Sequence, residues 1–276
     1  MNDFPQDFHF SQHNLQDYTD CPRRFELRYL QKLKWPALQS EPVLEMEHRA
    51  ELGRRFHELV HQSNLGLPDE QISSQAKDGE LALWWSEYQS SSLLNELPPD
   101  RKSEFLLSAP FGGFRLVAKY DLLAIEPGKR AVIVDWKTSS KPLPRKYLLE
   151  RLQTRIYPYL LALAGQSLNG GKRIDPSRLE LIYWFPSQPG KPVHIQYSDK
   201  LFSSDEDFLL NLVNDVSTRP AGQFPLTLDE KKCTYCVYRS LCNRGTQAGL
   251  WQEDQEEDEP SAGLEFPFDQ IGEIEF

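Results

Sequence analysis

The chain has 276 residues, of which 39% are hydrophobic and 12% aromatic, a composition that predicts a globular protein with a sizeable buried core. No apolar run approaches the ~20 residues of a membrane span, and the first ten residues lack the basic and apolar segments of a secretory signal, so we expect no membrane association and a cytoplasmic location. The formal net charge of −10 argues against a nucleic-acid partner, because phosphate contacts need Lys and Arg.

The distribution of charge removes that objection. Residues 252–276 hold ten of the 41 acidic residues and none of the 31 basic ones, which leaves 31 of each sign in residues 1–251. We predict one domain over 1–251, with a helical segment at 10–98 and a core at about 100–200, and an acidic, disordered tail over 252–276. The tail carries apolar side chains and ends in Phe276. It is a candidate docking peptide for a helicase or another repair or replication protein, or an acidic mask over a basic groove.

The helical segment begins with two predicted helices. Ser11 is a candidate N-cap for the first, and Pro22 is placed to start the second. Basic residues between Arg23 and Lys34 alternate with aromatic ones, which fits either a phosphate-binding face or an ordinary solvated helix surface. Cys21 lies at the junction of the two helices.

A third helix is predicted over 44–65, and it contains His57-Glu58-Leu59-Val60-His61, the HExxH pattern of zinc peptidases. In a peptidase the two histidines would bind zinc and Glu58 would act as the base. The residues that follow His61 offer no third histidine ligand, so the match by itself is weak. A further helix at 80–89 carries Trp84 and Trp85, which we expect in the core.

From residue 103 the pattern changes to strands, over 104–110, 114–125 and 131–138. Period-2 alternation puts Asp135 and Lys137 on the same face of the third strand, and the neighbouring strand carries Asp121. Carboxylates that hold Mg²⁺ or Mn²⁺ beside a cation that orients water are what phosphodiester hydrolysis needs. Glu104 is an additional candidate ligand. The alternatives are a surface hairpin with an ion pair and, for Glu104, an exposed strand carboxylate.

The next predicted helix runs from Tyr147 to Ala164. It places Gln153 and Tyr157 on one face, four residues apart, and Pro158 is expected to interrupt and kink it. Strands are predicted at 179–185 and 193–197 and a helix at 202–214.

Three cysteines follow in the pattern Cys233-x2-Cys236-x5-Cys242, far from Cys21. Four cysteines with one CxxC in a cytosolic chain indicate metal binding rather than disulfides. Tetrathiolate coordination suits either structural Zn²⁺ or an iron–sulfur cluster, and the softness of the thiolate ligands does not distinguish the two. Such a site would join the two ends of the domain.

Taken in order, these motifs resemble the RecB-type branch of the PD-(D/E)XK nuclease superfamily, and in particular its iron–sulfur members, such as the AddB subunit and the CRISPR adaptation exonucleases. The matching segments are GRRFHELV, AKYDLLAI, VDWKT, LQTRIY and the C-x2-C-x5-C ending. The chain departs from the family pattern at Ala118, Tyr120 and Pro158, none of which is a catalytic position.

The resemblance implies an α/β fold, with a mixed central sheet flanked by helices, an N-terminal helical segment and a C-terminal cysteine staple. It implies a divalent-metal-dependent DNA nuclease, expected to act as an exonuclease on single strands or ends. The implied metal ligands are His57, Asp121 and Asp135, with Lys137 catalytic beside the two aspartates. Gln153 and Tyr157 would contact DNA or brace the site. The implied [4Fe–4S] ligands are Cys21, Cys233, Cys236 and Cys242. A DNA-binding subunit without activity is the main alternative.

Overall fold

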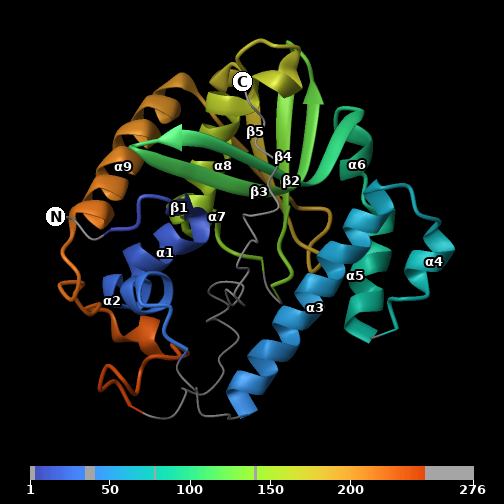
Figure 1. The fold of residues 1–276 in the computed structure, drawn as a ribbon. Helices are drawn as coiled ribbons and strands as arrows, with labels where there is room; N and C mark the ends of the chain where they lie inside the picture. The colour runs from blue at the N-terminus through green and yellow to red at the C-terminus, as the bar shows by residue number, and fades with distance from the viewer. Residues whose placement is uncertain (1–3, 35–40, 78, 140–141, 246–276) are drawn as a thin grey trace.

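The structure is a computed structural model that describes residues 4–34, 41–77, 79–139 and 142–245. In this part of the chain a six-stranded mixed sheet lies between helices (Figure 1). The predicted tail at 252–276 lies outside the described residues. Among the described helices, none combines the length and apolar composition that crossing a membrane requires. The strands are β1 (His9–Ser11), β2 (Asp100–Phe111), β3 (Phe114–Glu126), β4 (Arg130–Trp136), β5 (Leu179–Trp184) and β6 (Val193–Gln196).

The long strand β3 organises the sheet. On one edge it pairs with β2 in an antiparallel hairpin that turns at Gly112 and Gly113, both of which have positive φ. Its other edge is shared, because β1 pairs in parallel with residues 115–117 and β4 pairs antiparallel with residues 122–126. The middle of β3 therefore lies between the ends of two strands. β5 continues the sheet in parallel with β4, and β6 closes it antiparallel to β5.

Helices cover both faces of the sheet (Figure 1). One layer buries an aromatic cluster against β4 and β5, in which Phe56 stacks on Trp184 and Tyr88 meets Trp136 edge to face. The other layer packs on the opposite face, led by α8. The first layer contains α3 (Glu41–Asn64), α4 (Asp69–Ser73), α5 (Gly79–Ser90) and α6 (Leu93–Glu96), and the second contains α1 (Gln12–Asp20), α2 (Pro22–Phe25), α7 (Arg145–Glu150), α8 (Leu152–Ala164) and α9 (Asp199–Thr218). The predicted α/β class with a mixed central sheet is confirmed.

The alternation of side chains reverses once within the β2–β3 hairpin. Tyr120 lies in the core on the α8 side, whereas Leu122, two residues later, lies in the core on the α3 side. In regular strands such residues share a face. The reversal falls at Asp121 and Glu104, which lie between the ladder pairs Ser103–Leu122 and Phe105–Tyr120 and are not themselves paired; Glu104 has a φ of 54°. A non-glycine residue in the left-handed region stores backbone strain, so the hairpin is distorted where two carboxylates stand opposite each other.

The helix predicted over 147–164 is two helices, and the prediction that Pro158 interrupts it is wrong. The break falls at Arg151, which has φ −75° and ψ 139°, while Pro158 lies inside α8. The N–H of Leu152 bonds to the side-chain oxygen of Gln16 at 3.1 Å instead of to its own helix. A tertiary contact therefore sets the break, and α8 accommodates the loss of one backbone donor at Pro158.

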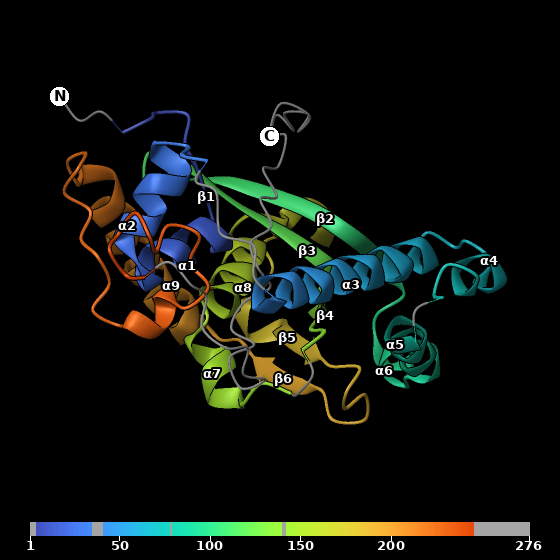
Figure 2. The same cartoon turned by 90° about the horizontal axis from the view of Figure 1, so that it is seen from below.

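The two ends of the described domain meet. Ser11 caps α1 as predicted, in a capping box with Asn14. Figure 2 shows α1, α2 and the chain that follows α9 together at one end of the molecule, with α4, α5 and α6 at the other. Tyr18 of α1 donates a hydrogen bond to Asp215 of α9, and the hydroxyl of Tyr238 donates to the carbonyl of Leu33 at 2.9 Å.

Candidate metal centre

Asp121 lies where β3 and β4 separate. The last ladder pair is Leu122 with Val134, and one step beyond it the register would place Asp121 opposite Asp135. There, Oδ2 of Asp121 accepts a hydrogen bond from the backbone N–H of Trp136 at 2.9 Å. The Asp121 carboxylate thus replaces the main-chain acceptor that a continued ladder would supply. Because of this replacement, β3 and β4 separate at the ends that carry Asp121 and Asp135.

Helix α3 brings His57 to the same point. Its Nδ1 lies 3.3 Å from Oδ1 of Asp121, and its Nε2 lies 2.9 Å from the carbonyl oxygen of Trp136. Gly53, one turn earlier, permits this approach, because a Cβ built there would lie 2.7 Å from Oγ1 of Thr138. The glycine therefore lets α3 pack against the segment that follows β4.

Glu104 belongs to the same group. Ligand atoms of His57, Glu104 and Asp121 all lie within 4.8 Å of one another. Ligands on opposite sides of a Mg²⁺ ion, at roughly 2.1 Å each, would be about 4.2 Å apart, so the separation fits a single cation. Oxygen donors with one imidazole suit Mg²⁺ or Mn²⁺. Glu104 is half-buried and pairs with Lys119, so it is not simply an exposed strand carboxylate.

Asp135 and Lys137 form a second group, on the α8 side of β4. Lys137 Nζ lies 3.0 Å from Oδ2 of Asp135, as the shared face predicts, and Gln153 of α8 donates to Oδ1 of the same carboxylate. Asp135 is 2% exposed and the Lys137 side chain 17% exposed. One partner at each oxygen, Lys137 at Oδ2 and Gln153 at Oδ1, holds this buried carboxylate in one orientation.

Tyr157 is buried and packs at a tilt of 51° against Tyr120, whose hydroxyl donates to the carbonyl oxygen of Tyr157 at 2.9 Å. Burial raises the pKa of Tyr157 well above its ordinary value, and the charges of Asp135 and Asp121 raise it further. The phenol therefore stays protonated, and the side chain lies buried between α8 and β3.

The electrostatics of Asp121 favour a carboxylate. Burial alone would raise its pKa, but the charge and hydrogen bond of His57, the N–H of Trp136 and the charge of Lys137 bring the pKa below its ordinary value. The effect of Lys137 on Asp121 shows that this cation lies within electrostatic range of the carboxylate. The site therefore combines an ionised carboxylate with a nearby cation.

The HExxH pattern does not form a zinc site among the described residues. His57 faces Asp121 and Trp136, whereas Nδ1 of His61 lies 2.7 Å from Oγ of Ser103 on β2. Glu58 is exposed. The helical spacing of these three residues thus leads to separate partners, which removes the basis of the peptidase alternative.

The four cysteines are brought together by the meeting of the two ends of the domain. Cys21 is buried and the other three are half-buried, all as free thiols. Burial raises the pKa of Cys233, and Cys236, Cys21 and Cys242 raise it further, so the four groups lie within electrostatic range of one another. The same order of causes, burial and then Cys236 and Cys21, raises the pKa of Cys242. Thiols are the donors that soft metals bind, although the Sγ atoms of these four residues are not among the described groups whose ligand atoms all lie within 4.8 Å of one another.

Sequence reasoning missed several features of this region. The sequence indicates the close approach of Gly53 to Thr138 only by placing a glycine inside a helix, in the GRRFHELV segment. The left-handed backbone at Glu104 and the bond from His61 to Ser103 have no signature in the sequence, because both depend on how α3 crosses β2.

The mixed sheet with its group of acidic, imidazole and lysine side chains defines an α/β protein with a candidate divalent-metal centre. The amino-acid sequence matches the family model of the PD-(D/E)XK nuclease superfamily over residues 9–243. The chain therefore belongs to the PD-(D/E)XK nuclease superfamily, whose members generally use divalent metals.

Comparison with curated proteins finds no match. Among solved structures, the chain is similar to the protein SSO0001 at 16% identity and a TM-score of 0.40, covering 85% of each chain. It is also similar to a candidate exonuclease from Eubacterium rectale at 10% identity and a TM-score of 0.47, covering 75% of this chain and 79% of the other. At these values, neither structure bears on the activity of this chain.

Proposed function

We propose that the protein is a divalent-metal-dependent deoxyribonuclease that acts as an exonuclease on single-stranded DNA or DNA ends, in repair, recombination or CRISPR-type processing. The observation that carries the proposal is the position of Asp121 beside His57 and Glu104 where β3 and β4 separate, with the Asp135–Lys137 pair at the same end of β4. Membership of the nuclease superfamily supports the reaction class, and the choice of DNA rests on the resemblance described above.

In this proposal His57, Asp121 and Asp135 hold the metal, with Glu104 as a further ligand and the carbonyl oxygen of Trp136 as a main-chain donor. A bound divalent ion supplies polarisation of the scissile phosphodiester and a lower pKa for the attacking water. Lys137 orients that water and offsets the charge that develops on the phosphate. Gln153 holds Asp135 in place through its hydrogen bond, and Tyr157 braces the site.

The test is cleavage of end-labelled single-stranded DNA with Mg²⁺ or Mn²⁺, comparing the native protein with Lys137→Ala. As a matched control, Lys191→Ala removes an exposed lysine in the chain between β5 and β6. We expect metal-dependent cleavage that Lys137→Ala abolishes and Lys191→Ala retains. If neither the native protein nor the control cleaves DNA, the protein is a DNA-binding subunit without activity of its own.

We further propose that Cys21, Cys233, Cys236 and Cys242 bind a structural [4Fe–4S] cluster. The convergence of four thiols supports a tetrathiolate site, and the spacing of three ligands near one end with a fourth near the other resembles iron–sulfur nucleases. Anaerobically purified protein should absorb broadly near roughly 400 nm, the thiolate-to-iron region. A colourless protein that contains one zinc per chain would show that the site is structural zinc instead.

A further inference from the structure

A pocket of about 330 Å³ opens at the opposite end of β4 from the candidate metal centre. It lies between the turn that joins β3 to β4 and the segment that follows α8. Basic side chains dominate its lining, with Asp175 as the acidic exception. The basic residues are Lys129, Arg130, Lys172, Arg173 and Arg178. We call this site the basic pocket.

Hydrogen bonds join the two segments of the basic pocket. Asn169, which is 9% exposed, accepts from the N–H of Gly128 at 2.7 Å and donates to the carbonyls of Lys172 and Arg173 at 3.0 and 3.1 Å. Arg178 donates to the carbonyl of Gly128. A buried amide that connects both segments fixes the positions of the basic residues, so less ordering is needed when a ligand binds.

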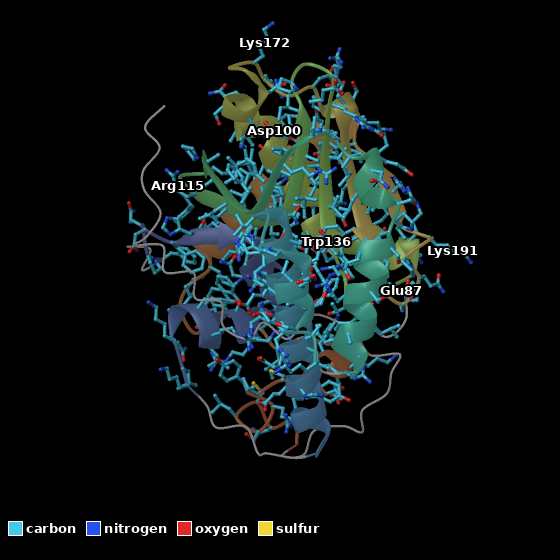
Figure 3. The ribbon with its side chains drawn as sticks, turned by 90° about the vertical axis from the view of Figure 1, so that its right-hand side faces the viewer. Glu87, Asp100, Arg115, Trp136, Lys172 and Lys191 are labelled. Atoms are coloured by element: carbon cyan, nitrogen blue, oxygen red, sulfur yellow. The ribbon has the colours of Figure 1, made fainter. Side chains whose placement is uncertain are left out.

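The acidic neighbours of the basic pocket cancel only part of its charge. Asp175 pairs with Arg178 at 3.6 Å, and Glu126 pairs with Lys129 on the exposed surface, which leaves three of the five basic residues without an acidic partner among these two. Arg173 lies over the ring of Phe202, 4.7 Å from its centroid, which orients the guanidinium without neutralising it. Lys172 projects into solvent at the upper end of the molecule in Figure 3. A net positive site on a chain of charge −10 favours a ligand with several negative charges.

We propose that the basic pocket binds the phosphate backbone of the nucleic-acid substrate away from the bond that is cut, an inference that rests on the proposed nuclease function for the identity of the ligand. Figure 3 places Trp136, where β4 ends, well below Lys172. Five residue steps along β4 separate Arg130 from Asp135, about 17 Å at roughly 3.3 Å per residue. That distance corresponds to about five stacked nucleotides at ~3.4 Å each.

The test compares two double variants, each prepared in Lys137→Ala protein so that cleavage does not interfere. Lys129→Gln with Lys172→Gln removes two exposed charges of the basic pocket, and Lys77→Gln with Lys191→Gln removes two exposed charges elsewhere. Binding of fluorescein-labelled single-stranded DNA of 20 and of 4 nucleotides is measured by anisotropy in Ca²⁺ between 50 and 200 mM salt. The 4-nucleotide strand is too short to reach both sites.

For the 20-nucleotide strand, the pocket variant should bind roughly fivefold to tenfold more weakly at 50 mM salt. The slope of log affinity against log salt should fall by about 1.4, since each single-strand phosphate contact contributes about 0.7. The control variant should match the parent protein, and the 4-nucleotide strand, which occupies one site at a time when stacked, should lose less affinity in the pocket variant than the 20-nucleotide strand does. Equal affinity and slope for the two double variants on the long strand would overturn the proposal.

Three outcomes are decisive. If a mononucleotide competes with the long strand in the parent and control but not in the pocket variant, the pocket is a site for a small phosphate ligand and the proposal fails. Absence of DNA binding by the parent protein at every salt concentration would refute the proposed function itself. Normal binding by the parent with no effect of the pocket variant would refute only the role of the basic pocket.

Discussion

The candidate metal centre and the cysteine-bearing end of the molecule are held together by contacts of different range. The metal centre is built from strand neighbours and one helix, with 79 residues between His57 and its partner Trp136 as the longest step. The cysteine end depends on contacts such as Tyr18 with Asp215, 197 residues apart, and Tyr238 with Leu33, 205 apart. Closing long loops costs conformational entropy, so the second region depends on strong cross-links. Changes at the metal centre should therefore affect activity, and changes at the cysteine end should affect stability.

The largest effect is expected for Asp135→Asn, which keeps the shape of the side chain but removes its charge. Cleavage of single-stranded DNA in Mg²⁺ should fall by roughly 10³-fold or more, because a neutral amide binds a divalent ion less well than a carboxylate and the bound ion contributes several kcal/mol to catalysis. Thermal unfolding and far-UV circular dichroism should be nearly unchanged, since Gln153 still has an oxygen to donate to. A variant that cuts DNA at the native rate would contradict the assignment of Asp135.

Cys236→Ser tests the other region. Loss of one ligand should remove the absorption near roughly 400 nm and lower the unfolding midpoint by about 10 °C. In a chain of this size, a loss of ~3–5 kcal/mol in the free energy of unfolding lowers the midpoint by about that amount. Structural metal sites contribute more than this to stability. The control is Ser203→Ala, which replaces an exposed serine. An unchanged midpoint with the absorption lost would show that the cluster does not hold the two ends together.

Gly53→Ala sharpens the comparison, because it alters the approach of α3 to the metal centre without removing a ligand. The added Cβ would meet Oγ1 of Thr138 at 2.7 Å and displace His57, and we expect a roughly tenfold lower kcat, since small misplacements of catalytic groups are costly. The free energy of unfolding should change little, because the cost of the close contact is offset by the higher helix propensity of alanine, which favours a helix by about 1 kcal/mol over glycine.

The double variant Gly53→Ala with Thr138→Ala separates this contact from other effects. Removing Oγ1 of Thr138 makes room for the new methyl group, so most of the lost kcat should return. A double variant no more active than Gly53→Ala would show that the glycine acts in another way.

The smallest effect is expected for Tyr18→Phe, at about 1 kcal/mol of unfolding free energy at neutral pH for the lost hydrogen bonds. Burial, and then the bond to Asp215, raises the pKa of Tyr18 to about 12, although Arg219 opposes the shift. The folded state thus holds the proton more tightly than the unfolded one. This contribution to stability is complete below pH 10 and is lost as the pH rises through 12.

Urea unfolding of native and Tyr18→Phe protein between pH 9 and 12 measures that contribution. The difference between the two proteins should shrink as the pH rises, whereas a constant difference would exclude the titration of Tyr18 as its source.

Much of the fold followed from sequence patterns. The hairpin at Gly112 and Gly113, the apolar strand before Asp135 and the capped helix after Ser11 all depend on local chemistry, and the structure contains them. The helix break was misplaced because Pro158 is a strong local signal, whereas the cause, Gln16 bonding to Leu152, lies 136 residues away.

The site was predicted unevenly for the same physical reason. The contact of Asp135 with Lys137 follows from alternation along one strand, and its geometry agrees. Glu104 joins His57 and Asp121 only because the alternation of β2 and β3 reverses at that pair, and no residue type announces such a reversal. The catalytic and cluster roles of these residues remain predictions that the experiments above address.

Trp136 gives the protein an optical reporter of its own metal centre. Its backbone N–H and carbonyl contact Asp121 and His57, while its indole ring, 1% exposed, meets Trp184 at 5.6 Å and Tyr88 at 5.4 Å. Movement of the backbone at the centre must therefore change the coupling between buried aromatic rings. Near-ultraviolet circular dichroism and tryptophan emission can follow titration with Mg²⁺ or Mn²⁺ without a label or a substrate.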